Sequence, residues 1–245
     1  MFAKLRSRTI IPRLNRSLFI QTQSTPNDHA LKFVPSGAGP LLPADVPGIE
    51  VDSVKDALVK SDLAFKLLSI NDKKISSVLI GSDFITVEKS PNLDWAILKP
   101  QVFTTLTEHL SMGMPVLKEE FLNSLKNKDK IKEDEEMTEE EELLMLINEL
   151  IQTRIRPAIL EDGGDVIFLK FEDGLVYLKL VGACKSCGSS EITLKNGIED
   201  MLKYYIDEVK GVVGVKDEDP EIEIETTKPV KKFDKIVVDE LPPSL

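Results

Sequence analysis

The chain has 245 residues, of which 42% are hydrophobic and 30% are charged, and this length is enough for two modest hydrophobic cores. Its formal net charge of −11 opposes binding to phosphate backbones, and its two cysteines exclude a disulfide-rich secreted scaffold. No stretch approaches the roughly 18 consecutive apolar residues that a transmembrane helix needs. We therefore expect a soluble two-domain protein with no membrane span and no nucleic acid partner.

The first 27 residues differ in charge from the rest of the chain, because they contain no acidic residue. Arginines, hydroxyl residues and interspersed apolar residues are typical of a mitochondrial transit peptide, and the apolar stretches are too short for a secretory signal. We predict that residues 1–27 are a transit peptide and that the protein lies in the mitochondrial matrix, where cysteines stay mostly reduced. A basic N-terminus that contacts nucleic acid or lipid is the alternative. The basic residues are Lys4, Arg6, Arg8, Arg13 and Arg16.

Residues 28–114 have the signals of one small α+β domain. Two runs rich in β-branched residues flank Gly81-Ser-Asp83, which is a hairpin signal. Over residues 94–110 apolar residues recur every four positions, which predicts a helix with one buried face. The only histidines, His29 and His109, are expected to be surface or helix residues rather than ligands. The expected elements are a strand at 31–34, helices from 54 and from 62, strands at 75–80 and 84–88, and a helix over 94–110.

Residues 115–138 lose this regular pattern and become first Lys-rich and then acidic. Nine of the fourteen residues from Asp129 to Glu142 are acidic, a composition typical of a solvated tether. We therefore predict a flexible acidic linker over 115–138. Thr138 followed by Glu141 matches a capping box, which predicts that a helix begins there.

Residues 139–225 are predicted to form a second small α+β domain with the element order α-β-β-α-β. Its first helix carries an apolar stripe that is interrupted at Pro157. Ser189 or Ser190 can cap its second helix. Strands are expected at 166–171, 175–181 and 212–215, with further strand at Ile222 and Ile224 and a loose tail over 226–245.

The only two cysteines, Cys184 and Cys187, lie three positions apart between a predicted strand and a predicted helix. Two thiolates at this spacing can bind one metal centre or form a redox disulfide, but no third cysteine exists to complete a tetrahedral set. A helix N-terminus and exposed backbone N–H groups favour the thiolate form. Small flanking residues would let a cofactor or a partner backbone approach. The pair is therefore half of a site.

Spacing alone leaves three functions open for this pair, beside inert structural cysteines, which would need no such spacing. A thiol-disulfide oxidoreductase normally has an aromatic residue before the motif and a proline inside it, and this chain has neither. A structural zinc needs four ligands, which two chains could supply by dimerising around the ion. An iron-sulfur cluster also needs four thiolates and could bridge two chains in the same way.

Several segments resemble the Nfu-type family of iron-sulfur scaffold proteins, in its mitochondrial form. In the second domain the resemblance rests on Arg154-Ile-Arg-Pro157, Glu161-Asp-Gly-Gly-Asp165, Gly182-Ala-Cys-Lys-Ser-Cys187, and Ser189-Ser190 with Thr193-Leu-Lys-Asn-Gly197. In the first domain, the segments similar to the family's N-terminal domain are Asp83-Phe-Ile-Thr-Val87 and Asp94-Trp95 with Leu98-Lys-Pro100. The chain departs from the family pattern at Gly188, where the family usually carries proline, but both cysteines are present.

The resemblance implies a homodimer in which Cys184 and Cys187 of both protomers bind one bridging [4Fe-4S] cluster. Such a protein works with cluster-assembly factors and passes its cluster to apo-proteins of the matrix such as lipoyl synthase. We therefore predict a scaffold or carrier rather than an enzyme. Gly163 and Gly164 are interpreted as turn residues without a ligand role. The N-terminal domain is expected to modulate stability, client docking or access to the cluster.

Overall fold

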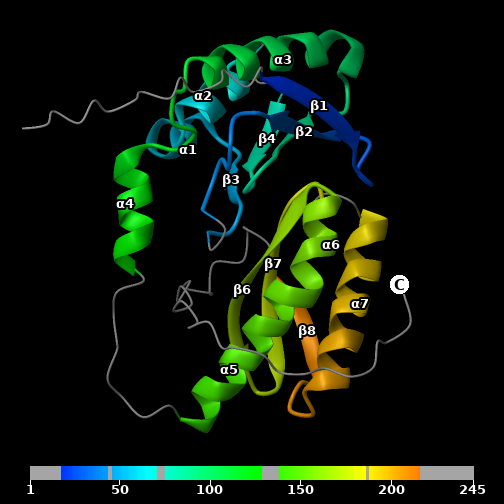
Figure 1. Cartoon of the computed structure of the whole chain (residues 1–245). Coiled ribbons are helices and arrows are strands. Elements are labelled where there is room, and N and C mark those ends of the chain that lie inside the picture. The colour runs from blue at the N-terminus through cyan, green and yellow to red at the C-terminus, as the bar shows by residue number, and fades with distance from the viewer. Residues whose placement is uncertain (1–17, 44–45, 71–74, 129–137, 186–187, 216–245) are drawn as a thin grey trace, which may run out of the picture. The chain divides into compact units, whose positions relative to one another are not determined.

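Figure 1 shows the computed structural model, which describes residues 18–43, 46–70, 75–128, 138–185 and 188–215. The chain divides into two compact units, residues 1–118 and residues 119–245. Each unit combines helices with a β-sheet, which confirms the predicted α+β class. Within the described ranges, no helix has both the length and the apolar character that crossing a bilayer requires.

The first unit is built on a five-stranded sheet with the strand order β1-β2-β5-β4-β3. Every neighbouring pair in it is antiparallel, and the hairpin predicted around Gly81 joins β4 to β5. The strands are β1 (Phe19–Ser24), β2 (Ala30–Ser36), β3 (Ile49–Val51), β4 (Ile75–Ile80) and β5 (Ile85–Lys89). The core between the sheet and its helices includes Phe33, Leu63, Leu67, Leu79, Ile85, Leu98 and Leu106.

Three helices of the first unit begin at residues whose side chains cap them. Ser53 Oγ accepts a hydrogen bond from the N–H of Asp56 at 3.2 Å, and Asp94 Oδ1 accepts one from Ala96 at 2.9 Å. Ser61 caps the next helix in the same way. Because these groups satisfy N–H donors that have no partner inside the helix, the predicted helix starts are confirmed. The helices are α1 (Val54–Lys60), α2 (Asp62–Leu68) and α3 (Trp95–Ser111).

Strand β1 corrects the predicted extent of the leader. Residues 19–24 were placed in the transit peptide, but they pair antiparallel with β2 from Phe19 opposite Ser36 to Ser24 opposite Leu31. The segment without acidic residues extends to residue 27, so composition alone does not separate this strand from the leader. Its local signal is only six residues long, and Ile20 is its one buried side chain. Residues 1–17 lie outside the described residues, so the transit peptide stays a prediction for them.

The predicted linker differs from the structure over residues 115–128. Val116 and Leu117 are buried, and Ser61 Oγ donates a 2.6 Å hydrogen bond to the carbonyl of Val116. Lys118 then donates its N–H to the carbonyl of Lys60 at 2.9 Å. Helix α4 (Glu119–Lys128) follows directly. The Lys-rich composition of this stretch hides two adjacent apolar residues, whose burial fastens the chain to the first unit. Residues 129–137, which hold much of the acidic run, lie outside the described residues.

The second unit has a three-stranded sheet in which β6 pairs antiparallel with β7 and β7 pairs parallel with β8. The predicted order α-β-β-α-β is confirmed. Its strands are β6 (Gly164–Glu172), β7 (Leu175–Gly182) and β8 (Gly211–Gly214), and helix α7 (Gly188–Tyr205) lies between β7 and β8 in the chain. Because α7 begins at Gly188, Ser189 and Ser190 lie in its first turn and not at its predicted cap. Ile222, Ile224 and the tail predicted over 226–245 lie outside the described residues.

The helix that precedes β6 passes Pro157 without ending. It consists of α5 (Glu139–Leu150), a π-helical turn η1 (Ile151–Ile155) and α6 (Arg156–Glu161). The capping box predicted at Thr138 is present in full at its start. Proline has no N–H, and its ring crowds the carbonyl one turn earlier, so the helix widens by one residue just before it. The predicted interruption is therefore a change of helix type.

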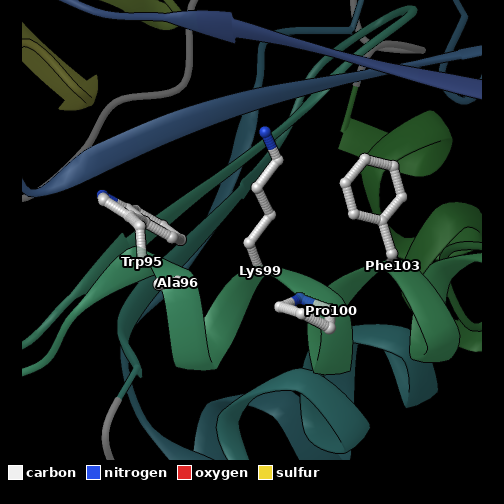
Figure 2. A pocket seen from close by; sticks show the side chains of 5 residues that line it. All are labelled: Trp95, Ala96, Lys99, Pro100 and Phe103. Carbon is white, nitrogen blue, oxygen red and sulfur yellow. The ribbon is translucent and has the colours of Figure 1, made fainter.

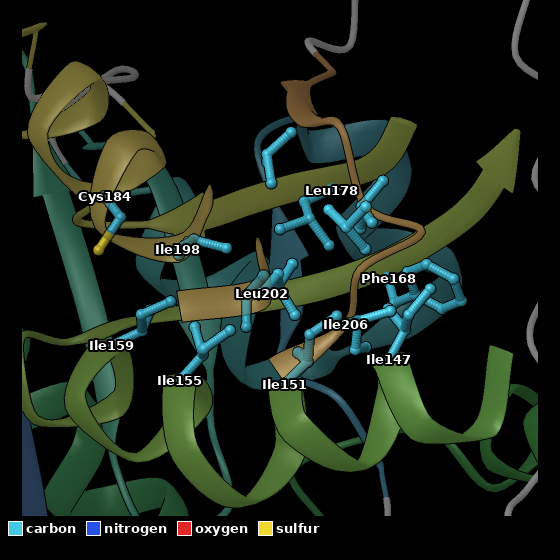
Figure 3. Close-up of a cluster of buried hydrophobic side chains, with 14 residues drawn as sticks. Ile147, Ile151, Ile155, Ile159, Phe168, Leu178, Cys184, Ile198, Leu202 and Ile206 are labelled. Carbon is cyan, nitrogen blue, oxygen red and sulfur yellow. The ribbon is translucent and has the colours of Figure 1, made fainter. Parts of the chain in front are cut away.

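The core of the second unit contains a cluster of buried apolar side chains (Figure 3). One isoleucine every four positions along α5, η1 and α6 faces the sheet, and α7 packs on the same core. Cys184 belongs to this cluster. The buried members that Figure 3 labels are Ile147, Ile151, Ile155, Ile159, Phe168, Leu178, Cys184, Ile198, Leu202 and Ile206.

Candidate metal centre

The two predicted ligand cysteines follow the end of β7. Gly182, the last residue of β7, has a φ of 68°, a left-handed conformation that favours glycine. Its carbonyl accepts a 3.1 Å hydrogen bond from the N–H of Lys185, which closes a tight turn around Cys184. Cys187 lies outside the described residues, and α7 begins with the next residue, Gly188. The predicted setting between a strand end and a helix start is therefore confirmed for Cys184.

The thiol of Cys184 is more deeply buried than the small flanking residues suggested. Only 6% of the residue is exposed, and it belongs to the cluster of buried apolar side chains (Figure 3). The residues on either side differ, since Ala183 is buried while Lys185 is partly exposed. The turn therefore directs the Cys184 side chain inward, into the core of the second unit.

The turn from α6 to β6 lies directly beside Cys184. Gly163 has a φ of 78°, which confirms that it is a turn residue, and its carbonyl accepts a 3.3 Å hydrogen bond from Ala183. Gly164 begins β6 and pairs with Gly182. A Cβ placed on Gly164 would lie 2.5 Å from Cys184 Sγ, closer than unbonded atoms approach. Gly164 thus has a packing role beyond the turn role that the sequence suggested, because it leaves space for the thiol.

A buried ion pair that no sequence motif indicated holds this turn in place. Arg156 Nε and Nη2 donate to the two carboxylate oxygens of Asp165 at 2.8 and 2.9 Å. The carboxylate is fully buried and also accepts the N–H of Val166 at 2.8 Å. Gln152 accepts a further hydrogen bond from Arg156. Both charged residues stand in the segments quoted for the family resemblance, but only the fold brings them together.

Glu199 of helix α7 joins this helix to strand β8. Its carboxylate accepts the N–H of Val212 at 3.1 Å and a hydrogen bond from Lys203. The pKa of Glu199 lies below its usual value, mainly because of the hydrogen bond from Lys203 and to a smaller extent because of the one from the Val212 N–H. The helix that follows the cysteines is therefore fixed to the sheet at its C-terminal half.

Potential metal ligands do not gather elsewhere in the part of the chain that the structure describes. In those residues, no group of three or more His, Cys, Asp or Glu side chains is arranged to hold a metal ion. His109 lies in α3 with 1% of its surface exposed, and its Nε2 lies 3.0 Å from the carbonyl of Pro115. His29 lies near Lys89, with Nδ1 3.4 Å from Nζ. His109 is therefore a helix residue, as predicted, although a buried one, and His29 is partly exposed.

The first unit carries a shallow apolar pocket of about 450 Å³ on the surface of α3 (Figure 2). Trp95 and Phe103 flank Lys99 in this view. The lysine donates a 2.9 Å hydrogen bond to Thr22 of β1, and the Trp95 indole donates to the carbonyl of Asp28 at 3.2 Å. These contacts fasten α3 to the β1–β2 hairpin, so a structural role explains them.

Both units match known protein families. Residues 147–213 match the family described as "NifU-like domain", and residues 20–113 match the family described as "Scaffold protein Nfu/NifU N terminal". The second match begins inside β1, in agreement with the structure and in contrast to the predicted leader boundary.

Three curated relatives are similar over most of the chain. A NifU-like protein of Schizosaccharomyces pombe is 44% identical over 211 residues, which cover 85% of this chain and 77% of that protein. The human NFU1 iron-sulfur cluster scaffold homolog, mitochondrial, is 44% identical and covers 83% of this chain and 74% of its own. A mitochondrial NifU-like protein of Saccharomyces cerevisiae is 40% identical, with 90% and 87% covered. The mitochondrial location in two of these names agrees with the prediction from the leader.

Proposed function

This chain belongs to the Nfu/NifU family of scaffold proteins, and on that premise we propose that it is a mitochondrial iron-sulfur cluster scaffold. In detail, we propose that two protomers assemble one [4Fe-4S] cluster through Cys184 and Cys187 of each chain. The cluster then passes to apo-proteins of the matrix, such as lipoyl synthase.

The observation that carries this proposal is the position of Cys184 at the junction of β7 and the turn before α7. Among the described residues, no group of three or more His, Cys, Asp or Glu side chains could hold a metal ion. With Cys187, one chain offers two thiolates, whereas a cluster of this type is held by four. A second copy of the chain supplies the other two in the simplest assembly.

Two thiolates from each chain also suit a carrier better than a permanent holder. A cluster held across an interface can be released when thiolates of a client replace those of the scaffold, one ligand at a time. The work of such a protein is ligand exchange, and no substrate bond needs a general acid or base. We therefore propose a scaffold that receives clusters with the help of assembly factors and is not an enzyme.

Anaerobic reconstitution with iron and sulfide tests this function. We expect about four irons and about four acid-labile sulfides per dimer. One zinc per dimer without sulfide would instead support a zinc-bridged interaction module. A reversible disulfide between Cys184 and Cys187, with reductase turnover, would support a redox protein.

The variant Cys187→Ser is expected to lose cluster loading and to keep the circular dichroism spectrum of the folded chain. Gly197→Ala is a suitable control, because a Cβ at Gly197 meets no atom within 4 Å. Loading of Cys187→Ser at the wild-type level would contradict the proposed ligand set.

A further inference from the structure

The position of Cys184 in the structure is not one from which its sulfur can bind a cluster shared with a second chain. With 6% of the residue exposed and its side chain among those of the core, the sulfur is covered by its own unit. A bridging cluster must contact both chains, so its ligand atoms must lie at the surface. The thiol therefore has to move outward before it can bind iron.

The inward position is built into the backbone around it. A Cβ on Gly164 would lie 2.5 Å from Cys184 Sγ, 3.1 Å from Cys184 Cβ and 2.9 Å from the carbonyl oxygen of Val181. Any residue larger than glycine at position 164 would therefore occupy the space that the thiol now fills. We call this space, bounded by Gly164, Val181 and the apolar cluster, the thiol seat.

The backbone of Gly164 is held too firmly to move aside for a larger residue. Gly164 pairs with Gly182 in the β6–β7 ladder, and the preceding carbonyl, of Gly163, accepts the N–H of Ala183. The next residue, Asp165, is fixed by two hydrogen bonds from Arg156. The side chain of Cys184, by contrast, lies in a turn after the end of β7. A methyl group at position 164 is therefore expected to displace the thiol, which it would approach most closely, and its 2.9 Å approach to the Val181 carbonyl also strains the adjoining strand.

We propose that Gly164 is a positioning residue that keeps the thiol seat open for Cys184 in the cluster-free protein, and that the thiol leaves this seat to bind the cluster. This inference rests on the proposed scaffold function. The seat and the cluster then compete for one sulfur, so the apparent affinity for the cluster equals the intrinsic affinity multiplied by the fraction of molecules whose thiol is outside the seat. Return of the thiol to the seat favours release of the cluster to a client. The seat also shields the thiol from oxidation while no cluster is present.

Alkylation of the cluster-free full-length chain tests the seat without any cluster. In a Cys187→Ser background Cys184 is the only thiol, and its reaction with iodoacetamide reports its exposure. We expect the folded chain to react at least about ten-fold more slowly than the chain in guanidinium. Adding Gly164→Ala should bring the folded rate close to the denatured rate, whereas adding Gly197→Ala should leave it slow. Equal rates for the folded and denatured Cys187→Ser chain would overturn the inference, even if Gly164→Ala fails to fold.

Cluster transfer tests the consequence in the chain with both cysteines. After reconstitution, Gly164→Ala is expected to pass its cluster to an apo-ferredoxin acceptor several-fold more slowly than wild type, because its thiol has no seat to return to. The Gly197→Ala chain should transfer at the wild-type rate. Transfer from Gly164→Ala at or above the wild-type rate would contradict the competition between seat and cluster. If wild type takes up no cluster, the scaffold function itself fails, and the alkylation rates still decide whether the seat exists.

Discussion

At the scale of single residues, a substitution in the buried Arg156–Asp165 pair is expected to lower stability strongly. Asp165 is fully buried and accepts hydrogen bonds from two guanidinium nitrogens and one backbone N–H. Removing one partner of such a pair leaves the other charge buried without compensation, which costs far more than the pair itself contributes. Since the pair holds the strand next to Gly164, its loss should also disturb the thiol seat.

We predict that Asp165→Asn lowers the free energy of unfolding of the second unit by about 3–5 kcal/mol, as measured by urea denaturation. Glu172→Gln is the matched control on the same strand, because it breaks the exposed ion pair with Lys170. The control should change stability little. Equal effects of the two variants would show that the buried pair does not fix this turn.

His109 gives the first unit a predictable pH dependence. Burial, above all, lowers its pKa from the ordinary value of 6.5, and Lys66 lowers it further, while the hydrogen bond to Pro115 and the charge of Asp62 act in the opposite direction. The folded state therefore keeps the imidazole neutral at a pH where the unfolded chain already binds a proton. By linkage, stability is fully present above about pH 6.5 and is lost as the pH falls below it toward the lowered pKa.

Denaturation of the first unit between pH 7 and pH 5 tests this expectation. The wild-type chain should lose stability over this range, and His109→Gln, which keeps a donor for the Pro115 carbonyl, should lose less. His29→Gln, which removes the chain's other imidazole, serves as the control. A wild-type slope in His109→Gln would mean that other groups cause the pH dependence.

At the scale of elements, Ser61 joins two parts of the first unit through one hydroxyl group. Its Oγ accepts the N–H of Ala64 at 3.1 Å, which caps α2, and donates to the carbonyl of Val116 at 2.6 Å. Ser53 caps α1 at an exposed position, where its Oγ accepts the N–H of Asp56. The two serines therefore separate the effect of capping from the effect of holding residues 115–118.

We predict that Ser61→Ala destabilises the first unit by about 2–3 kcal/mol and Ser53→Ala by about 1 kcal/mol. The difference arises because only Ser61→Ala also removes a buried hydrogen bond to the segment that was predicted to be linker. Thermal unfolding of both variants measures this difference in stability. Similar losses would indicate that the hydrogen bond from Ser61 to the Val116 carbonyl contributes little to stability.

Elements with local signals could be predicted from the sequence, and those that depend on distant contacts could not. Capping residues and four-residue spacing locate α1, α2, α3 and α5, and the turns at Gly81 and Gly174 locate the β4–β5 and β6–β7 hairpins. Strand β1 was assigned to the leader because a basic composition concealed a short pairing signal. The role of Gly164 could not be predicted, because it depends on the folded chain bringing the residues after β7 next to the start of β6. The pairing of Arg156 with Asp165 likewise depends on the turn between α6 and β6. Periodicity within one segment carries no information about such a contact.

At the scale of the whole molecule, the chain consists of two units that each have their own sheet and core. Both predicted ligands lie in the second unit. We predict that a fragment of residues 119–245 folds and loads a cluster at a stoichiometry similar to that of the full chain. Iron and sulfide counts on the reconstituted fragment measure this, with Cys187→Ser in the same fragment as the control. A folded fragment that takes up no cluster would show that the first unit takes part in assembly.

The mass of the anaerobically reconstituted full-length protein under native conditions tests the central claim most directly. We predict a species with two chains and one [4Fe-4S] cluster, which returns to single cluster-free chains when the cluster is removed. A cluster bound to a single chain, or a dimer that contains zinc and no sulfide, would contradict the account.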